Sequence, residues 1–215
     1  MDTGGLKLNE GQYLSIAEPV DYECVITRSR FIASLRRATN RTEFERELQE
    51  ITRLYPKATH HCWAYRFEAH PILEHSSDAG EPPGTAGRPM LGALKKYSLS
   101  NIMAVVTRYY GGVKLGVKGL ISAYGGTLLM ALEHAEIVER EPMSRLNFIC
   151  TYDLYNILLS RLVKFQISQE MIKTEFAEHV SGEIQVPNSI LTALTKELAS
   201  ISPGGRNLSY TLLPH

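Results

Sequence analysis

Six basic side chains lie between Pro82 and Leu132, in a stretch of the sequence that contains no aspartate or glutamate. These side chains are Arg88, Lys95, Lys96, Arg108, Lys114 and Lys118. At the average acidic content of the chain, 23 in 215 residues, a stretch of this length would hold about five or six carboxylates. Positive charge without neighbouring carboxylates indicates an anionic partner, so this stretch is the first candidate for a functional surface.

The motif RYYGGVKLGVKGLISAYGG combines basic and aromatic residues. Lys114 and Lys118 are one helical turn apart, and Arg108, Tyr109 and Tyr110 stand at the end of the preceding predicted strand. Basic groups can neutralise phosphates, and aromatic rings can stack on bases, so the motif suits nucleic acid. The alternative is that the lysines are ordinary solvated surface residues.

The loop SSDAGEPPGTAGRP precedes a predicted helix, whose first backbone N–H groups favour negative charge. Glycines allow close backbone approach and hydroxyls add donors, so the loop could form an anion-binding cradle. The candidate ligand-binding residues are Ser76, Ser77, Asp78, Glu81, Gly84, Thr85 and Gly87, together with Gly111 and Gly112 of the following motif. Neither GxxxxGK[ST] nor GxGxxG occurs. A rigid structural loop, in which Asp78 or Glu81 satisfies backbone donors, is an equally good interpretation.

Five small residues, at Gly112, Gly116, Gly119, Ala123 and Gly126, recur at spacings of three and four. This spacing predicts a seam without large side chains along one side of a helix. For Gly119, Ala123 and Gly126 we expect tight packing onto the sheet of the same domain. For Gly111 and Gly112, which directly precede this helix, a role facing a ligand is more plausible.

A zinc site is a weak hypothesis for His60, His61 and Cys62, with His70 and His75 downstream. Neither CxxC nor HExxH occurs, and adjacent residues on a strand point to opposite faces. A lone Cys62 is also far more often a buried thiol than a nucleophile. We therefore expect no metal site, no cofactor and no catalytic residue.

Length and composition indicate two domains in a chain of 215 residues with 44% apolar content. The formal net charge is zero, so the positive field is a local patch. Three widely separated cysteines suit free thiols in a reducing compartment, and no apolar run is long enough to span a bilayer. These features predict a cytoplasmic location without membrane partners.

Hydrophobic periodicity predicts an α+β fold with domains at 19–141 and 145–215. We expect residues 1–18 to form an extended or partly ordered arm and residues 70–89 to form a loop. Predicted strands of the first domain cover residues 22–26, 30–35, 58–68 and 101–108. Three helices are predicted in this domain. The first runs from a cap at Asn40 or Thr42 to about Leu54, the second is a short helix that follows the loop and ends at Lys96, and the third runs from Leu115 to about Val138.

The second domain is predicted to have the element order β-α-β-β-α-β, after a linker at 142–147. Its predicted elements are strand 145–152, helix 153–164, strands 171–178 and 183–187, helix 189–201 and strand 208–213. This order is the split βαβ, or ferredoxin-like, arrangement.

Four motifs in this order resemble the YigZ/IMPACT family in its bacterial two-domain form. They are SRFIA (29–33), HHCWAYR (60–66), SSDAGEPPGTAGRPML (76–91) and VVTRYYGGVKLGVKGLISAYGG (105–126). The resemblance implies an N-terminal βαβ domain of the ribosomal-protein and elongation factor G domain IV type, followed by a ferredoxin-like domain. It also implies a link to translation: eukaryotic relatives regulate a starvation-response kinase pathway by binding a partner protein. The family commonly has glycine where this chain has Lys118.

We therefore predict a non-enzymatic protein that engages RNA or the ribosome through an exposed basic groove. Its residues would be Arg88, Arg108, Lys114 and Lys118, with Tyr109 and Tyr110 available for stacking. One alternative is an enzyme or sensor that binds a nucleotide or another small phosphorylated ligand between GEPPGTAG and RYYGG. Another is a regulator that binds a translation-related protein partner.

Overall fold

The computed structural model describes residues 11–68, 71–201 and 207–213. Backbone contacts divide the chain into two compact units. The first contains Tyr13–Arg140, and the second contains the chain from Glu141 onward. Among the described helices, none is both long and apolar enough to cross a bilayer.

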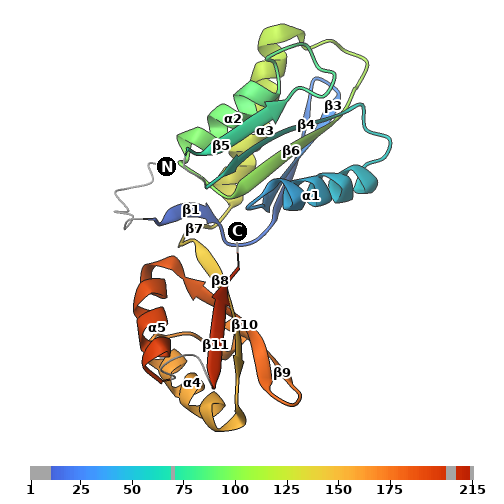
Figure 1. Ribbon diagram of the computed structural model, residues 1–215. Helices are drawn as coiled ribbons and strands as arrows, with labels where there is room; N and C mark the ends of the chain where they lie inside the picture. The colour runs from blue at the N-terminus through green and yellow to red at the C-terminus, as the bar shows by residue number, and fades with distance from the viewer. Residues whose placement is uncertain (1–10, 69–70, 202–206, 214–215) are drawn as a thin grey trace. The chain divides into compact units, whose positions relative to one another are not determined.

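A five-stranded antiparallel sheet forms the centre of the first unit (Figure 1). Its strands, in spatial order, are β2 (Val20–Ile26), β3 (Ser29–Arg37), β6 (Ile102–Tyr109), β4 (His60–Phe67) and β5 (Leu73–Ser77). The first and last strands of the unit, β1 (Tyr13–Ile16) and β7 (Ile137–Arg140), form a separate two-stranded ladder. The central strand β6 is buried along almost its whole length, as expected for the apolar sequence IMAVVTR.

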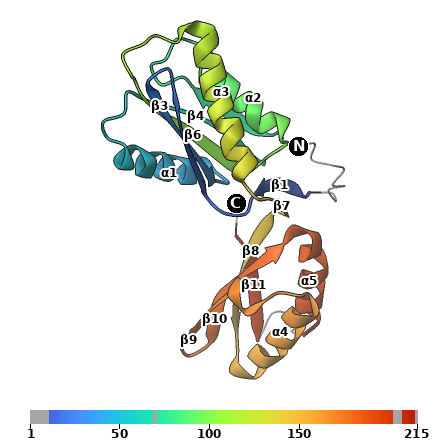
Figure 2. The ribbon, with the colours of Figure 1, turned by 180° about the vertical axis from the view of Figure 1, so that it is seen from behind.

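Helices cover both faces of this sheet. Helix α1 (Arg41–Leu54) lies on one face, while α2 (Gly87–Lys96) and α3 (Gly116–His134) lie side by side on the other (Figure 2). Alternate residues of β6 enter the two cores because successive strand side chains point to opposite faces. The Asn40 side chain caps α1 by accepting a hydrogen bond from the Glu43 backbone N–H, so of the two predicted caps, Asn40 and Thr42, the structure has Asn40.

Three elements of the first unit differ from the sequence-based expectation. Strand β5 lies within the predicted loop, and β1 lies within the predicted arm. Helix α3 ends at His134, which leaves the following residues free to form β7.

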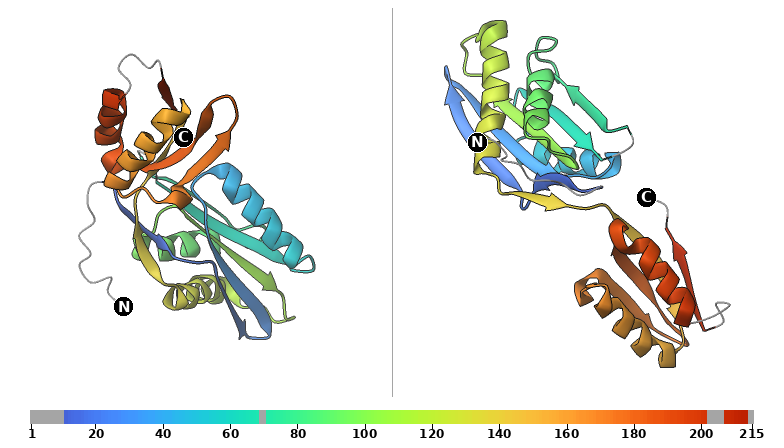
Figure 3. Two further views of the ribbon diagram at one scale, coloured as in Figure 1. Left: turned by 90° about the horizontal axis from the view of Figure 1, so that it is seen from below. Right: turned by 90° about the vertical axis from the view of Figure 1, so that its left-hand side faces the viewer.

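The second unit contains a four-stranded antiparallel sheet with two helices on one face (Figure 3). Its elements are β8 (Met143–Cys150), α4 (Tyr152–Lys164), the 3-10 turn η1 (Gln169–Met171), β9 (Ile172–Phe176), β10 (Val180–Pro187), α5 (Asn188–Ile201) and β11 (Leu208–Leu212). The spatial strand order is β11-β8-β10-β9. Leucines from both helices pack on the sheet, among them Leu158, Leu162, Leu194 and Leu198. The chain is therefore of the α+β class, as predicted.

Candidate functional site

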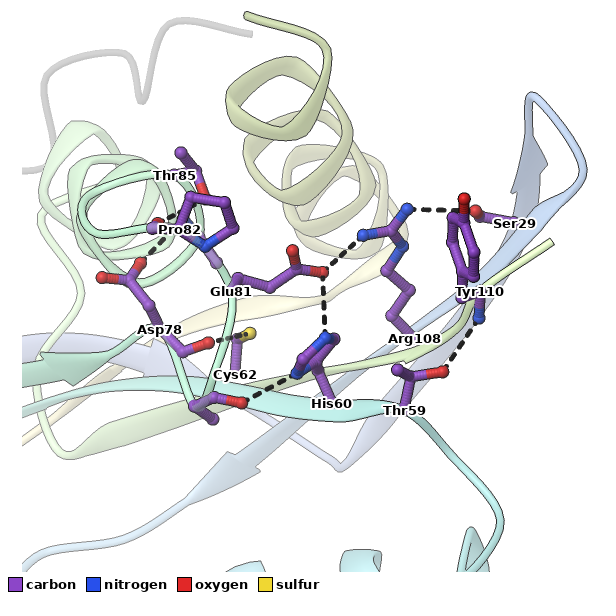
Figure 4. Close-up of polar contacts among 12 residues, drawn as sticks. Ser29, Thr59, His60, Cys62, Asp78, Glu81, Pro82, Thr85, Arg108 and Tyr110 are labelled. Carbon is purple, nitrogen blue, oxygen red and sulfur yellow. Dashed lines mark hydrogen bonds and ion pairs between the residues drawn. The ribbon is translucent and has the colours of Figure 1, made fainter. Parts of the chain in front are cut away.

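Residues from four of the sequence motifs meet at one end of the five-stranded sheet. Ser29 begins β3, His60 begins β4, and Arg108 lies in β6 directly opposite His60. The loop that follows β5 crosses this end of the sheet and places Glu81 between His60 and Arg108 (Figure 4). Antiparallel register is therefore what brings these distant segments together.

Arg108 is buried, and its charge is neutralised inside the protein. Its Nη1 donates to Glu81 Oε1 at 2.6 Å, and its Nη2 donates to Ser29 Oγ at 3.2 Å. The guanidinium carbon also lies 5.4 Å from the centre of the Phe31 ring and 5.3 Å from that of Tyr110. The expectation that Arg108 contributes an exposed positive charge is therefore wrong, because a carboxylate and two rings enclose it.

Glu81 Oε1 accepts a second hydrogen bond, from the Tyr124 hydroxyl of α3 at 2.8 Å. His60 completes the cluster with its Nε2 3.9 Å from the same oxygen. Its other nitrogen, Nδ1, lies 2.9 Å from the carbonyl oxygen of Ala79, and a carbonyl can only accept. Nδ1 therefore carries a ring proton and donates it to this carbonyl.

Cys62 and Tyr124 are held in their neutral forms by this environment. Burial raises the pKa of Cys62 to about 12, and its Sγ donates to the Asp78 carbonyl at 2.9 Å. Burial and the neighbouring Cys62 and Glu81 also raise the pKa of Tyr124. A thiol that stays protonated at neutral pH is a poor nucleophile, so the cluster offers no activated cysteine.

The Asp78 carboxylate binds the backbone N–H groups at the start of helix α2. Its Oδ1 accepts from the Ala86 and Gly87 N–H groups at 2.9 Å, and its Oδ2 accepts from Gly84 N at 2.8 Å. Burial alone would raise the pKa of Asp78, but these backbone donors and Arg88 outweigh it, so the pKa is lowered. The cradle predicted for an external phosphate thus holds a carboxylate of the chain itself. These contacts fit the interpretation of a rigid structural loop in which Asp78 satisfies backbone donors. The N–H groups that a phosphorylated ligand would need are already bonded to Asp78.

The hydroxyls of the loop are likewise used internally. Thr85 Oγ1 donates to the Pro82 carbonyl at 2.7 Å, and Ser77 Oγ accepts from Ala79 N at 3.2 Å. Ser76 is half-buried in β5, where it pairs with Ala64.

Two glycines of the site allow close backbone packing. A Cβ added to Gly87 would lie 2.8 Å from Ser77 N. A Cβ added to Gly111 would overlap the Arg28 carbonyl, and Gly111 N donates to Ser29 Oγ at 3.2 Å. Gly84 and Gly112 instead adopt positive φ angles of 78° and 83°, which suit glycine.

The helical small-residue seam packs differently from the prediction. Ala123 is buried, but a Cβ added to Gly126 would meet no heavy atom within 4 Å, and one added to Gly119 would meet only the side chain of Leu115. It is Gly125 that faces α2, where an added Cβ would lie 3.4 Å from Pro89 Cβ. The expectation that Gly119 and Gly126 pack tightly onto the sheet is therefore wrong.

Three of the predicted basic residues, Arg88, Lys114 and Lys118, are exposed. Within the described part of the chain, none of the three forms an ion pair. Tyr110 is 45% exposed, and its backbone N–H donates to Thr59 Oγ1 at 3.0 Å. Tyr109 is half-buried, with the Arg30 guanidinium 5.3 Å from its ring centre.

The histidines considered as zinc ligands have separate partners. His61 Nδ1 lies 3.0 Å from Thr107 Oγ1, away from the contact that His60 makes, and burial lowers the pKa of His61. His75 Nδ1 contacts the Ser76 carbonyl, and His70 lies outside the described residues. Across the described ranges, no group of three or more His, Cys, Asp or Glu side chains could hold a metal ion.

Sequence reasoning did not select Ser29, His60 or Tyr124 as members of one cluster. A usable signal was present for Tyr124, because it places a hydroxyl on the mostly apolar buried side of the helix and needs a polar partner there. Ser29 lies directly before the predicted strand 30–35, and His60 lies near the start of the predicted strand 58–68. Only the strand register shows that they are close.

Comparison with known proteins shows similarity over nearly the whole chain. A family model described as "Impact N-terminal domain" matches residues 27–132. IMPACT family member YvyE of Bacillus subtilis is 35% identical over 192 residues, which cover 89% of this chain and 88% of the relative. YigZ of Escherichia coli is 31% identical over 198 residues, covering 91% of this chain and 96% of the relative. A crystal structure of a hypothetical protein has a TM-score of 0.66 and 30% identity, covering 95% of this chain and 98% of that one. The chain therefore belongs to the IMPACT family.

Proposed function

We propose that this protein is a cytoplasmic RNA-binding protein linked to translation or its regulation. It would act by binding rather than by catalysis, with RNA or the ribosome as its partner. The observation that carries the proposal is the pair of exposed lysines Lys114 and Lys118, which form no ion pair with any described residue and lie in a segment without a single carboxylate. The exposed Arg88 lies in the same segment, beside Asp78.

Phosphate contact by these side chains is favourable because each neutralised phosphate releases condensed counterions. Lys114 and Lys118 stand at the start of α3, whose unpaired N–H groups add positive potential. Nearby carboxylates would compete with phosphate for these lysines, and no carboxylate of the described residues forms an ion pair with either of them.

Tyr110 supplies a platform on which a base can stack. Its backbone is fixed by Thr59, and its ring lies over the buried Arg108 guanidinium. An exposed ring that is already held in place loses little conformational freedom when it stacks. In this proposal Arg108 positions Tyr110 and does not touch the RNA, while Tyr109 is a secondary stacking candidate.

The translation link comes from the family resemblance. We propose that the first unit has the fold type of elongation factor G domain IV and certain ribosomal proteins. The second would be ferredoxin-like, which its element order β-α-β-β-α-β supports. Family members in eukaryotes act through a protein partner, so a translation-related protein that joins the RNA complex is compatible with this proposal.

The test is the affinity of the full chain for fluorescently labelled single-stranded RNA, measured as a function of salt. Lys114→Glu with Lys118→Glu should weaken binding, and should reduce the salt slope by about 0.7 for each phosphate that the protein no longer neutralises. Tyr110→Ala should cost about 1–3 kcal/mol if one base stacks on it.

A matched control changes two exposed lysines of the second unit, Lys164→Glu with Lys173→Glu. This control alters the net charge by the same amount and should leave the affinity close to that of the wild type. Equal affinity of the Lys114/Lys118 variant and the wild type would refute the proposed surface.

A further inference from the structure

Three loops of the first unit meet at the end of the sheet where β6 ends and Tyr110 follows. The backbone N–H of Tyr110 donates to Thr59 Oγ1 at 3.0 Å, which ties the β6–α3 loop to the loop that precedes β4 (Figure 4). The next residue is Gly111, and a Cβ added to it would overlap the Arg28 carbonyl, so the same loop packs against the β2–β3 turn. Because β3 and β4 are the two neighbours of β6 in the sheet, the segment that carries the exposed Tyr110 ring is held between this turn and this loop.

The turn and the loop on either side of Tyr110 each carry an exposed cation. Arg28 is the last residue of the β2–β3 turn, and Lys57 lies two residues before Thr59. Both side chains are exposed, and neither forms an ion pair with any described residue. Lys114 supplies a third such cation from the β6–α3 loop itself. Two of these three cations thus come from outside the acid-free stretch of the sequence.

The carboxylates at this end of the sheet are bonded inside the protein. The loop after β5 contributes two of them, Asp78 and Glu81. Asp78 accepts from backbone N–H groups at the start of α2, and Glu81 is buried against Arg108. No other carboxylate occurs in the four connecting segments at this end, which are residues 27–28, 55–59, 78–86 and 110–115. The charges that these segments expose are therefore positive.

The backbone of the β2–β3 turn is strained for its sequence. Thr27 and Arg28 have φ angles of 45° and 67°. Positive φ at both positions of a two-residue hairpin loop is typical of a type I′ turn, in which Asn-Gly is favoured. A β-branched residue followed by a long side chain is unfavourable in this conformation. The arginine is therefore better explained by what its side chain binds than by the needs of the turn.

We propose that Arg28 and Lys57 bind phosphates of a single-stranded RNA that crosses this end of the sheet and stacks one base on Tyr110. This inference rests on the proposed function and names its substrate class. A base can stack on a protein ring only where it is free of its own neighbours, as in single strands and loops. Arg28 and Lys57 come from the two sides of Tyr110, so they can contact phosphates on either side of the stacked base, while Lys114 contacts the same strand.

An acidic peptide is the other ligand that three unpaired cations could attract. Tyr110 favours RNA, because its ring is 45% exposed among these cations and glutamate or aspartate side chains have no flat face to stack on it. Polyglutamate therefore serves as a probe of charge without bases. Tyr110→Ala should weaken binding of single-stranded RNA by about fivefold or more and leave the affinity for polyglutamate unchanged.

The test is the affinity of the full chain for labelled oligouridylate, measured as a function of salt. Arg28→Glu with Lys57→Glu should weaken binding by about tenfold or more at low salt, and should reduce the salt slope by about 0.7 for each phosphate contact that is lost. The exchange Arg28→Lys with Lys57→Arg keeps both charges and should bind like the wild type. An RNA duplex of the same length should bind more weakly than the single strand.

A matched control reverses two cations of helix α1, Arg41→Glu with Arg46→Glu. The net charge changes by the same amount in the same unit, but both arginines already have carboxylate partners, at Glu45 and Glu47. This control should bind oligouridylate with nearly the affinity of the wild type. An equal loss in the control and in the Arg28/Lys57 variant would refute a specific site.

A turn variant separates a binding role of Arg28 from a structural one. Thr27→Asn with Arg28→Gly installs the residues that a type I′ turn favours, so the thermal unfolding midpoint should rise. RNA binding should nevertheless weaken, with a salt slope reduced by about 0.7, because one phosphate contact is lost. Unchanged RNA affinity of this variant would refute the assignment of Arg28.

Failure of this inference can be told apart from failure of the proposed function. Wild-type affinity and salt slope in the Arg28/Lys57 variant would overturn the inference, and weakened binding by the Lys114/Lys118 variant in the same assay would leave the proposed function intact. Wild-type affinity in both variants would refute both proposals. A duplex bound as tightly as the single strand, or an equal loss of polyglutamate and RNA binding in Tyr110→Ala, would refute single-stranded RNA as the ligand.

Discussion

Glu81 Oε1 lies 2.6 Å from Arg108 Nη1, in an ion pair whose side chains are only 4% and 6% exposed. The two residues come from a loop and from the central strand β6, so the pair fixes the loop to the sheet. Burying two charges costs desolvation free energy, and their mutual attraction offsets this cost only while both partners are present.

Loss of one partner should be far more harmful than loss of both. Arg108→Met leaves the Glu81 carboxylate buried without its cation, which should reduce the free energy of unfolding by about 3–5 kcal/mol. The double variant Glu81→Gln, Arg108→Met should be less destabilised than the Arg108→Met single variant. Urea unfolding followed by the fluorescence of Trp63 measures this effect in the first unit, because Trp63 is the chain's one tryptophan and lies in β4. If the double variant lost as much free energy of unfolding as the two single variants together, the pair would not be coupled.

Asp78 should make the stability of the first unit depend on pH in the acidic range. Its folded-state pKa is lowered, so its contribution is present above the unfolded pKa, near 4, and is lost as the pH falls through the lower folded value. At neutral pH, Asp78→Asn should be less stable than the wild type by about 1–3 kcal/mol, because three backbone donors lose their carboxylate. The difference should narrow as the pH is lowered below 4.

The measurement for Asp78 is urea unfolding followed by Trp63 fluorescence at several pH values. Glu50→Gln, which changes an exposed carboxylate of α1, serves as the control and should follow the wild type at every pH. A constant gap between Asp78→Asn and the wild type would contradict the assigned capping role.

Two glycine-to-alanine changes should shift stability in opposite directions. Gly111→Ala places a methyl group against the Arg28 carbonyl, and the required shift of the β2–β3 turn should cost about 1–3 kcal/mol. Gly92→Ala lies within α2, where an added Cβ meets nothing within 4 Å, and should stabilise the unit by about 0.5–1 kcal/mol. Thermal unfolding of both variants tests this, and equal midpoints would contradict the close approach at Gly111.

Local sequence patterns predicted most of the elements of the fold. The helix at α1, the buried strand β6 and the element order of the second unit all follow from periodicity and caps within a few neighbouring residues. Strands β1 and β5 did not follow from such patterns. β1 depends on pairing with β7, more than a hundred residues later, and β5 lies in a sequence rich in turn residues but is held by its ladder with β4.

The charge of the site likewise could not be predicted from the local sequence. The acid-free stretch begins at Pro82, directly after Glu81, and Glu81 is the carboxylate that neutralises Arg108. A charge count along the chain therefore treats Arg108 as unopposed. Among the described residues, by contrast, Lys114 and Lys118 form no ion pair.

The ladder between β1 and β7 joins the beginning and the end of the first unit, with Tyr13 opposite Arg140. A module that starts and finishes at adjacent points can be inserted into a surface loop of an unrelated host, or given a new start elsewhere, without separating its core elements. The adjacent ends of the first unit thus favour its transfer into another protein as one continuous segment.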